Sequence, residues 1–344
     1  MSIKVGFNGF GRIGKLAFQA ALEKGDEVDI VAINDPFITA DYMAYMVKYD
    51  TMHGRFNGTI ESKENVLVVN GKEIKVYNEM DPHNIPWGEL GVEYVFECSG
   101  VFTTMEKAQA HLDAGAKKVL ISAPSKDAPM FVMGVNQEKY TPDMNIISNA
   151  SCTTNCLAPM ANALNNYAKI KSGIMTTVHA YTGDQMILDG PHRKEDLRRA
   201  RAGAINIVPN STGAAKAIGL VIPELKGKLI GSAQRVPVPT GSTTILVAVV
   251  EGKNITKESI NEYMKSVSND SYGYIDEPIV SSDIIGISYG SLFDATQTMV
   301  NKIDEDTYQV QVVAWYDNEY GYTCQMVRTA SYLMEISEWS LFFL

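Results

Sequence analysis

The segment Ser151-Cys152-Thr153-Thr154-Asn155-Cys156 carries the residue types that nucleophilic catalysis needs. The pattern of residues 151–166 predicts a helix with Ser151 in the N-cap position. Cys152 then falls in the first helical turn, where backbone N–H groups and the helix dipole lower the pKa of a thiol. We therefore expect Cys152 to be a nucleophile. A cysteine considered alone is more often a small buried core residue, which is how we interpret Cys156.

A proton-transfer partner for this thiol would be a histidine. His179 ends an alternating segment, Ile174–His179, that predicts a strand. Beside Cys152 it could hold a thiolate as an ion pair and then act as base and acid. A histidine in this position can also be structural or exposed, and the sequence alone does not show that the two side chains meet.

Several residues, most of them beyond position 180, have the side chains of an anion-binding site. Arg235 lies inside an apolar strand pattern, 229–236, where a buried anion partner is favoured over a purely solvated charge. The run Asn210-Ser211-Thr212-Gly213 precedes a predicted helix, 214–219, whose N-terminus offers backbone and hydroxyl donors. Further donors could come from Thr153, Thr182 and Arg199. We interpret most other arginines between 193 and 201 as solvated or subunit-contact residues.

A second kind of site is indicated near the N-terminus, where Gly9-Phe10-Gly11-Arg12-Ile13-Gly14 follows one predicted strand and opens a helix. In a G-x-G-x-x-G motif the first glycine makes a tight turn, the second lets the backbone approach a pyrophosphate, and the third allows close packing of helix and strand. Asp35 ends the next strand, about twenty residues further on, where its carboxylate can accept both ribose hydroxyls and repel a 2′-phosphate. The motif alone could be a glycine-rich turn, but with Asp35 it predicts binding of NAD rather than NADP.

The elements that must position these residues fall into two patterns. Through residue 150, apolar strand segments alternate with helical segments, which predicts a doubly wound parallel α/β sheet of the Rossmann type. Further strand patterns, at 174–179, 229–236, 243–250 and 309–315, indicate an α+β domain with a mixed or antiparallel sheet. We therefore expect an NAD-binding domain over 1–151, completed by a C-terminal helix at about 317–336, and a catalytic domain over 152–316.

Composition restricts the partners of this chain. It has 344 residues, 45% of them hydrophobic, and 30 Lys and Arg against 40 Asp and Glu give a formal net charge of −10. An acidic chain is a poor general binder of nucleic acid, and no apolar run reaches the roughly 20 residues of a membrane span. The four cysteines and five scattered histidines show neither a disulfide framework nor paired zinc-ligand spacing. The N-terminus has a strand pattern and not that of a signal peptide, so we expect a cytoplasmic protein with no metal and no dedicated nucleic-acid or membrane partner.

Taken together, these segments resemble phosphorylating glyceraldehyde-3-phosphate dehydrogenase of the bacterial type. The resemblance rests on residues 8–14, 151–156, 179–185, 198–201 and 315–319, and it extends in order from about residue 3 to residue 336. The run around Cys152 is its most specific part, whereas the glycine motif is shared with many dinucleotide-binding proteins.

The resemblance implies a role for each matching residue. Cys152 is the implied nucleophile, and His179 is its base and acid. The implied cofactor contacts are Gly9, Gly11, Arg12, Ile13, Asp35, Ser122 and Asn318. Thr182 and Arg235 resemble the substrate-phosphate site. The residues that resemble the inorganic-phosphate side are Ser151, Thr153, Arg199, Thr212 and Gly213.

The resemblance also implies a reaction and an assembly. The reaction is the glycolytic oxidative phosphorylation of D-glyceraldehyde 3-phosphate to 1,3-bisphosphoglycerate, with reduction of NAD, through a thiohemiacetal and a thioester on Cys152. The assembly is a homotetramer in which residues 181–210 form an S-shaped loop near a neighbouring subunit. That loop is also too long and too rich in arginine for us to expect one chain to order it alone. Two alternatives stay open: an erythrose-4-phosphate dehydrogenase of the same architecture, and a surface-binding role on the same fold.

Overall fold

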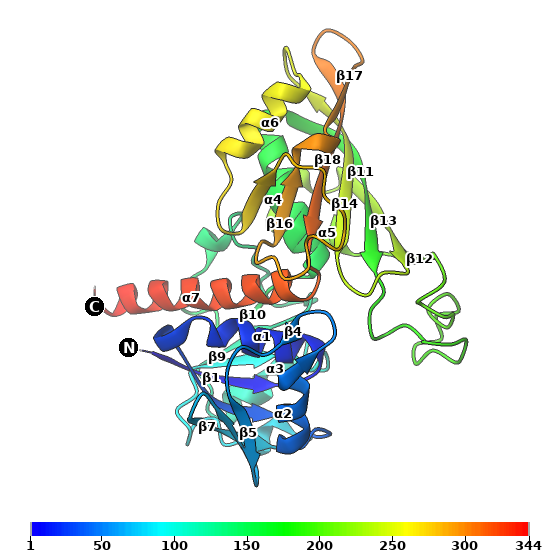
Figure 1. Cartoon of the computed structure of the whole chain (residues 1–344). Coiled ribbons are helices and arrows are strands. Elements are labelled where there is room, and N and C mark those ends of the chain that lie inside the picture. Colours follow the sequence, from blue (N-terminus) through cyan, green and yellow to red (C-terminus); the bar gives the residue numbers. More distant parts are fainter. Residues whose placement is uncertain (1, 343–344) are drawn as a thin grey trace. The chain divides into compact units, whose positions relative to one another are not determined.

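The computed structural model describes residues 2–342, and its contacts divide the chain into two compact units. The first comprises the residues up to 131, residues 137–151 and the residues from 323 on, while the second comprises residues 132–136 and 152–322. Each unit is built around an eight-stranded sheet of its own (Figure 1).

In the first unit the strands lie in the order β10-β9-β8-β1-β2-β7-β6-β5. Their bounds are β1 Ile3–Asn8, β2 Val28–Asn34, β5 Ile60–Lys63, β6 Val66–Val69, β7 Lys72–Tyr77, β8 Tyr94–Glu97, β9 Lys118–Ile121 and β10 Ile146–Ser148. From β10 to β7 neighbouring strands pair in parallel, which confirms the doubly wound sheet predicted from the alternation of strands and helices. The accompanying helices are α1 Arg12–Leu22, α2 Ala40–Lys48, α3 Met105–Asp113 and α7 Tyr320–Phe342, whose first residues belong to the second unit.

The edge of this sheet formed by β5, β6 and β7 is antiparallel, unlike the purely parallel sheet that the sequence predicts. Its two turns contain Asn65, with φ 54°, and Asn70, with φ 50°, which is followed by Gly71. Asn-Gly is the strongest short-range hairpin signal because both residues tolerate positive φ. Residues 70–71 are therefore the signal in the sequence that reveals this hairpin.

The register of β1 places three strand ends side by side. Asn8 pairs with Asn34 of β2 and with Glu97 of β8. The chain therefore leaves all three strands at one carboxyl edge of the sheet, and the glycine motif and Asp35 begin there. This is the edge at which doubly wound sheets bind their ligands.

In the second unit the strand order is β12-β13-β11-β14-β18-β16-β15, and β17 pairs with β18. The bounds are β11 Lys169–Ala180, β12 Val208–Ser211, β13 Leu229–Val236, β14 Ser242–Glu251, β15 Tyr272–Ile275, β16 Ser291–Asp294, β17 Met299–Lys302 and β18 Thr307–Tyr316. Strand β11 pairs with β13, and β15 with β16, in parallel, while the other pairs are antiparallel, so the mixed sheet predicted from the sequence is confirmed. The helices are α4 Cys152–Tyr167, α5 Ala214–Val221 and α6 Lys257–Ser266.

The two faces of this second sheet differ in burial. Helix α4 packs against β11, β14, β16 and β18, and the residues of β14 alternate between buried and half-buried. On the face away from the helix, Ile174 and Ile230 are register partners on β11 and β13, and their exposed fractions are 56% and 65%. This unit therefore presents an apolar sheet face that its own helices do not cover.

Within residues 2–342, no helix combines the length and the apolar composition needed to cross a membrane. All four cysteines are free thiols.

Candidate active site and dinucleotide site

The sulfur of Cys152 and the imidazole of His179 are in contact. Cys152 begins α4, His179 is the next-to-last residue of β11, and Sγ lies 3.5 Å from Nε2. The other ring nitrogen, Nδ1, lies 2.7 Å from the carbonyl oxygen of Ala180. Because a carbonyl oxygen can only accept, Nδ1 carries the ring proton and donates it, which leaves Nε2 as an acceptor facing the thiol. The imidazole is therefore oriented to take a proton from Cys152.

Burial governs the protonation of this pair. It raises the pKa of the Cys152 thiol, against the opposing effects of a hydrogen bond with Thr153 and the charge of Arg235. Burial, and then the charge of Arg235, lower the pKa of His179 to about 4. The prediction that the helix N-terminus lowers the pKa of Cys152 is therefore wrong for this structure. Burial raises this pKa by more than the stabilising contacts lower it. The resting thiol and imidazole are neutral, and transfer of the proton to Nε2 creates an ion pair whose two groups titrate together.

Tyr316 is a part of this site that the sequence does not reveal. Its hydroxyl lies 3.0 Å from Oγ1 of Thr153 and 2.8 Å from Oγ1 of Thr177. Its ring meets the imidazole of His179 edge-on, with 5.8 Å between the ring centroids and 74° between the planes. Burial raises the pKa of Tyr316, which keeps the hydroxyl protonated. A tyrosine at the end of a strand carries no sequence signal for this supporting position.

Strand pairing brings Arg235 next to His179. The two residues are register partners on the parallel strands β11 and β13. The Arg235 side chain is only 15% exposed, and its Nη1 donates to the hydroxyl of Thr182 and, at 3.2 Å, to Oε1 of Gln185. Two of the predicted phosphate ligands, Arg235 and Thr182, are therefore together beside the imidazole.

The anion that the arginines hold in this structure is Asp184. Its carboxylate lies 3.3 Å from Nη1 of Arg235 and is also paired with Nη1 of Arg199. Burial alone would raise the pKa of Asp184, but the hydrogen bond from Thr182 and the charges of Arg235 and Arg199 lower it. Asp184 thus marks the point at which two guanidinium groups converge on one anion. Sequence reasoning singled out both arginines and missed this carboxylate, although it follows Thr182 by two residues.

The remaining predicted donors of this unit lie at the N-terminus of α5. Oγ1 of Thr212 accepts from the backbone N–H of Ala214 at 3.2 Å, and Gly213 occupies the N-cap position without a side-chain cap. A Cβ at Gly213 would meet nothing within 4 Å, so the space beside it is open. Asn210, the next-to-last residue of β12, accepts a hydrogen bond from Nε of Arg199 at 3.0 Å and so connects this segment with the arginine pair.

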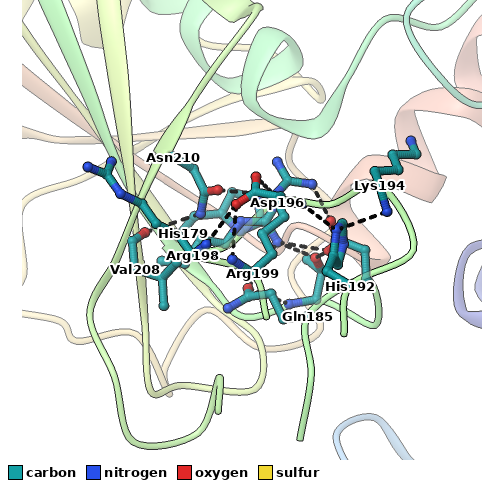
Figure 2. Close-up of polar contacts among 12 residues, drawn as sticks. His179, Gln185, His192, Lys194, Asp196, Arg198, Arg199, Val208 and Asn210 are labelled. Atoms are coloured by element: carbon teal, nitrogen blue, oxygen red, sulfur yellow. Dashed lines mark hydrogen bonds and ion pairs between the residues drawn. The ribbon is translucent and has the colours of Figure 1, made fainter. Parts of the chain in front are cut away.

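The loop between β11 and β12 is held by bonds within the chain (Figure 2). Oδ1 of Asp196 accepts from the backbone N–H groups of Arg198 and Arg199 at 3.0 and 3.1 Å, and Nδ1 of His192 accepts from the N–H of Lys194 at 3.2 Å. Short polar side chains thus bond to the backbone at the turns of this loop, within one chain. Its large apolar side chains are nevertheless exposed: Ile187, Leu188, Leu197, Ile205 and Ile207.

Asn318 is connected through Ser242 to β11, the strand that carries His179. Its Oδ1 accepts from Oγ of Ser242 at 2.9 Å and from the N–H of Gly241 at 3.2 Å. Oγ of Ser242 in turn accepts from the N–H of Ala180, next to His179, at 3.0 Å. Because these bonds fix the oxygen of the Asn318 amide, its N–H groups form the side that can donate to a ligand.

In the first unit the glycine motif has the geometry of a pyrophosphate cradle. Gly9 has φ +92°, and a Cβ at Gly14 would lie 2.0 Å from the carbonyl oxygen of Gly9, so both positions require glycine. A Cβ at Gly11, in contrast, would meet nothing within 4 Å. Gly11 is also the N-cap of α1 and provides no side chain for the first-turn amides. Open space next to uncapped N–H groups fits the pyrophosphate of a dinucleotide.

Asp35 has a structural role in addition to the predicted ribose contact. Its Oδ2 accepts from the N–H of Phe10 at 2.8 Å, and its Oδ1 accepts from the N–H of Phe37 at 3.0 Å. The carboxylate therefore ties the glycine motif to the end of β2. Each carboxylate oxygen has a further lone pair, so acceptor capacity remains for ribose hydroxyls.

The side chain of Arg12 is paired with a buried carboxylate that sequence reasoning missed. Its Nη1 lies 2.5 Å from Oδ2 of Asp50, which also forms an ion pair with Lys15. Burial alone would raise the pKa of Asp50, but hydrogen bonds from His53, Lys15 and Arg12 lower it. Asp50 therefore holds the first turn of α1 through two of its cationic side chains.

Three further predicted contacts lie beside element ends. Ile13 is half-buried in the first turn of α1, Ser122 directly follows β9, and Ser151 directly precedes α4. Their roles as ligand contacts stay predictions. Among the described residues, no group of three or more His, Cys, Asp or Glu side chains is arranged to hold a metal ion.

Two family models match the chain. Residues 3–105 match the family described as glyceraldehyde 3-phosphate dehydrogenase, NAD binding domain. Residues 151–318 match the family described as glyceraldehyde 3-phosphate dehydrogenase, C-terminal domain. Together the two matches cover most of the chain.

Similar proteins carry the corresponding name. A glyceraldehyde-3-phosphate dehydrogenase of Clostridium pasteurianum is 58% identical over 336 residues, which is 97% of this chain and 99% of that protein. One of Streptococcus pyogenes is 58% identical over 340 residues, 98% of this chain and 100% of that protein. A third, of Clostridium acetobutylicum, is 56% identical over 336 residues, 97% of this chain and 99% of that protein. The similarity thus extends over nearly the whole chain.

Proposed function

Because this chain belongs to the glyceraldehyde-3-phosphate dehydrogenase family and is an NAD-dependent oxidoreductase of glycolysis, we propose that it converts D-glyceraldehyde 3-phosphate and inorganic phosphate to 1,3-bisphosphoglycerate. The observation that carries this proposal is the 3.5 Å contact between Sγ of Cys152 and Nε2 of His179, beside the largely buried Arg235. A thiol, a base and a cation are the groups needed to capture a phosphorylated aldehyde covalently.

Capture begins when Sγ of Cys152 attacks the aldehyde carbon and the thiol proton passes to Nε2 of His179. The carbonyl oxygen becomes an oxyanion, which the imidazolium and the backbone N–H of Cys152 stabilise before it takes the proton. The product is a thiohemiacetal, whose hydroxyl proton His179 accepts during oxidation. When bound, NAD would supply the two-electron oxidant for this carbon, and the oxidised product on Cys152 is a thioester.

Inorganic phosphate then attacks the thioester carbonyl, the C–S bond breaks, and the sulfur recovers its proton from His179. We propose that Thr182 and Arg235 hold the phosphate of the substrate, because they are adjacent to the imidazole. The attacking phosphate is proposed to bind a second set of donors: Ser151, Thr153, Arg199, Thr212 and Gly213. The thioester conserves the free energy of oxidation that hydrolysis would release.

The cofactor is assigned to the residues around the glycine motif. When bound, NAD would be held by Gly9, Gly11, Arg12, Ile13, Asp35, Ser122 and Asn318. We accordingly propose 1–151, with a C-terminal helix at about 317–336, as the NAD-binding domain and 152–316 as the catalytic domain. We also propose a cytoplasmic location, which the four free thiols support.

The proposed reaction is tested by following NADH formation from glyceraldehyde 3-phosphate with and without inorganic phosphate. We expect many turnovers with phosphate and a burst limited to the number of chains without it, because the thioester then has no acceptor. Erythrose 4-phosphate at the same concentration is the control substrate. The proposal would be contradicted if the rate of turnover did not depend on phosphate, or if erythrose 4-phosphate were oxidised faster than glyceraldehyde 3-phosphate.

Replacing Arg235 by leucine should mainly weaken capture of the phosphorylated aldehyde. A charge-assisted hydrogen bond to phosphate contributes about 1.5–3 kcal/mol, so kcat/KM for glyceraldehyde 3-phosphate should fall roughly 10- to 150-fold. Activity on unphosphorylated glyceraldehyde should change much less. The matched control is Arg201→Leu, since that arginine is mostly exposed and pairs with Asp189. Equal losses with both aldehydes would show that Arg235 is structural.

We propose that the chain forms a homotetramer, which the uncovered apolar surface of the second unit supports. Ile174 and Ile230 on the open sheet face, and Leu188 and Leu197 on the loop after β11, are all more than half exposed. Apolar clusters of this kind on a closed oligomer are buried against identical subunits. Light scattering at micromolar concentration should therefore give the mass of four chains. A stable monomer at that concentration would refute the assembly.

A further inference from the structure

A buried chain of hydrogen bonds lies in the first unit, and the proposed mechanism does not use it. At its centre is Glu97, the last residue of β8, whose side chain is fully buried. Oε2 accepts from Nδ2 of Asn8 at 2.6 Å and lies 2.9 Å from Nε2 of His111. Oε1 accepts from the N–H of Ser99 at 2.8 Å and from the Ser99 hydroxyl. Nδ1 of His111 lies 3.1 Å from Nε1 of Trp87.

The hydrogen-bond partners fix the position of the proton in this chain. An indole N–H can only donate, so Nδ1 of His111 accepts from Trp87. The ring proton of His111 is therefore on Nε2 and is donated to Glu97. The carboxyl group of Glu97 thus accepts hydrogen bonds from four donors. A group that only accepts, such as a carboxylate, suits this arrangement.

The chain continues toward the neighbouring strand through two amides. Nδ2 of Asn34 donates to Oδ1 of Asn8 at 2.8 Å and to the carbonyl oxygen of Glu79 at 3.0 Å. Oδ1 of Asn34 accepts from the N–H of Glu79 at 2.8 Å. Two series of donors therefore lead to Glu97, one from Asn34 through Asn8 and one from Trp87 through His111.

Three residues of this hydrogen-bond chain lie at the strand ends next to the proposed dinucleotide site. Asn8, Asn34 and Glu97 are register partners and close β1, β2 and β8. The residue after Asn8 is the first glycine of the motif, and the residue after Asn34 is Asp35.

We propose that Glu97 and His111 are positioning residues for NAD: the carboxylate collects four donors and thereby fixes the strand ends from which the glycine motif and Asp35 begin. This inference rests on the proposed binding of NAD at that edge. It differs from the cofactor contacts already assigned, because neither residue needs to touch the cofactor.

The side chains around Glu97 and His111 explain why the loss of one donor would move the strand ends. Trp87 is fully buried, and its ring packs so closely on β1 that a Cβ at Gly6 would lie 2.5 Å from it. The ring of Phe102 meets that of His111 edge-on, with 5.7 Å between the centroids. Among these rings a missing donor is not easily replaced by water, so the carboxylate and the two asparagine amides must rearrange instead.

The test is the dissociation constant of NAD for the full-length Glu97→Gln variant, measured by titration calorimetry together with the melting temperature of the cofactor-free protein. Glutamine has the shape of glutamate but presents an NH₂ group to the donors of Asn8 and His111 or to those of Ser99. We expect the Asn8 amide to rotate, so that its hydrogen bond with Asn34 is lost. The strand end then shifts, and the glycine motif that follows Asn8 is displaced. The dissociation constant should rise roughly tenfold or more, in line with the loss of one charge-assisted hydrogen bond.

A stability control separates positioning from general loss of structure. Leu67 is a fully buried core residue of β6 in the same unit, and it has no part in the hydrogen-bond chain. Leu67→Ala should lower the melting temperature and leave the dissociation constant of NAD unchanged.

A pair of His111 variants tests the same chain without changing the carboxylate. His111→Gln keeps a donor for Glu97 and an acceptor for Trp87, whereas His111→Leu keeps neither. We expect NAD affinity near that of the unmodified protein for His111→Gln and clearly weaker binding for His111→Leu. If Glu97→Gln does not fold, this pair decides the question.

Each outcome has a distinct meaning. If the unmodified protein does not bind NAD, the proposed function fails. If it binds NAD and Glu97→Gln binds equally well within about twofold, the positioning role is overturned. The role is also overturned if Leu67→Ala weakens NAD binding as much for the same loss of melting temperature, or if the two His111 variants bind NAD equally.

Discussion

Replacement of Cys152 by serine should lower kcat/KM for glyceraldehyde 3-phosphate by at least about a thousandfold, since the nucleophile of a covalent mechanism acts as one unit with its base. A serine hydroxyl loses its proton far less readily than a thiol, and the pKa of His179, lowered by burial to about 4, makes the imidazole a weak base for it. A serine ester would also be a poorer acyl donor to phosphate than a thioester. Steady-state assay of NADH formation measures the loss.

The matched control for this variant is Cys156→Ser. Cys156 lies one helical turn further along α4, and its Sγ is 3.7 Å from the carbonyl oxygen of Ala314, to which a serine hydroxyl can also donate. We expect this variant to keep most of the activity. If Cys156→Ser were as inactive as Cys152→Ser, the assignment of the nucleophile would fail.

Alkylation gives an independent measure of the same nucleophile. Burial raises the pKa of Cys156 to about 12 and also raises that of Cys98, and neither thiol has an imidazole acceptor like His179. Iodoacetamide should therefore label Cys152 first, as shown by peptide mapping, with loss of activity in step.

The pH dependence of this alkylation tests His179. In the unmodified protein the thiol proton can pass to Nε2 across the 3.5 Å contact. In His179→Asn the thiolate forms only by losing its proton to solvent, against the burial that raises the pKa of Cys152. The alkylation profile should therefore shift to higher pH. An unchanged profile would show that His179 does not act on the thiol.

The second large effect concerns the choice between NAD and NADP. Asp35 is 8% exposed and stands at the end of β2, where a 2′-phosphate would meet its negative charge. Two like charges in contact and partly desolvated cost about 4 kcal/mol, so kcat/KM should favour NAD roughly a thousandfold. Steady-state kinetics with both cofactors gives this ratio, and equal kcat/KM values would contradict the role of Asp35.

The variant that tests this role must respect the structural bonds of Asp35, which accepts from the N–H groups of Phe10 and Phe37. Asp35→Asn keeps one of these acceptors and removes the charge. We expect the ratio of kcat/KM for NADP to that for NAD to rise, while the affinity for NAD itself falls. The melting temperature shows whether the glycine motif has kept its place.

Local patterns in the sequence were sufficient for the four longest strands of the second sheet and for the helix that begins at Cys152, but not for the short strands of that sheet. The strand predicted over 229–236 is β13, and the helix predicted over 151–166 is α4 to within one residue at each end. The glycine motif was equally readable, because a positive φ at Gly9 and a close approach at Gly14 exclude other side chains. Such features depend on neighbours in the chain, so residue order alone determines them.

The antiparallel edge from β5 to β7 shows where local interpretation was incomplete. Its Asn-Gly turn at 70–71 is a local signal, but the strands that it joins are short. Their pairing with the parallel part of the sheet through β7 and β2 joins segments about forty residues apart, which no local pattern specifies.

The tertiary structure alone decided which of the candidate residues meet and in which protonation state. Arg235 lies beside His179 because β11 pairs in parallel with β13. Cys152 reaches His179 from the first turn of α4, which packs against β11, and Asp184, in the loop after β11, pairs with two arginines. The sequence predicted a thiol activated by the helix N-terminus, whereas burial of the assembled site raises the pKa of Cys152. Burial is a property of everything that surrounds a group, and long-range strand pairing determines those surroundings; the sequence could therefore name the reacting residues, but only the fold determined their contacts and their charge.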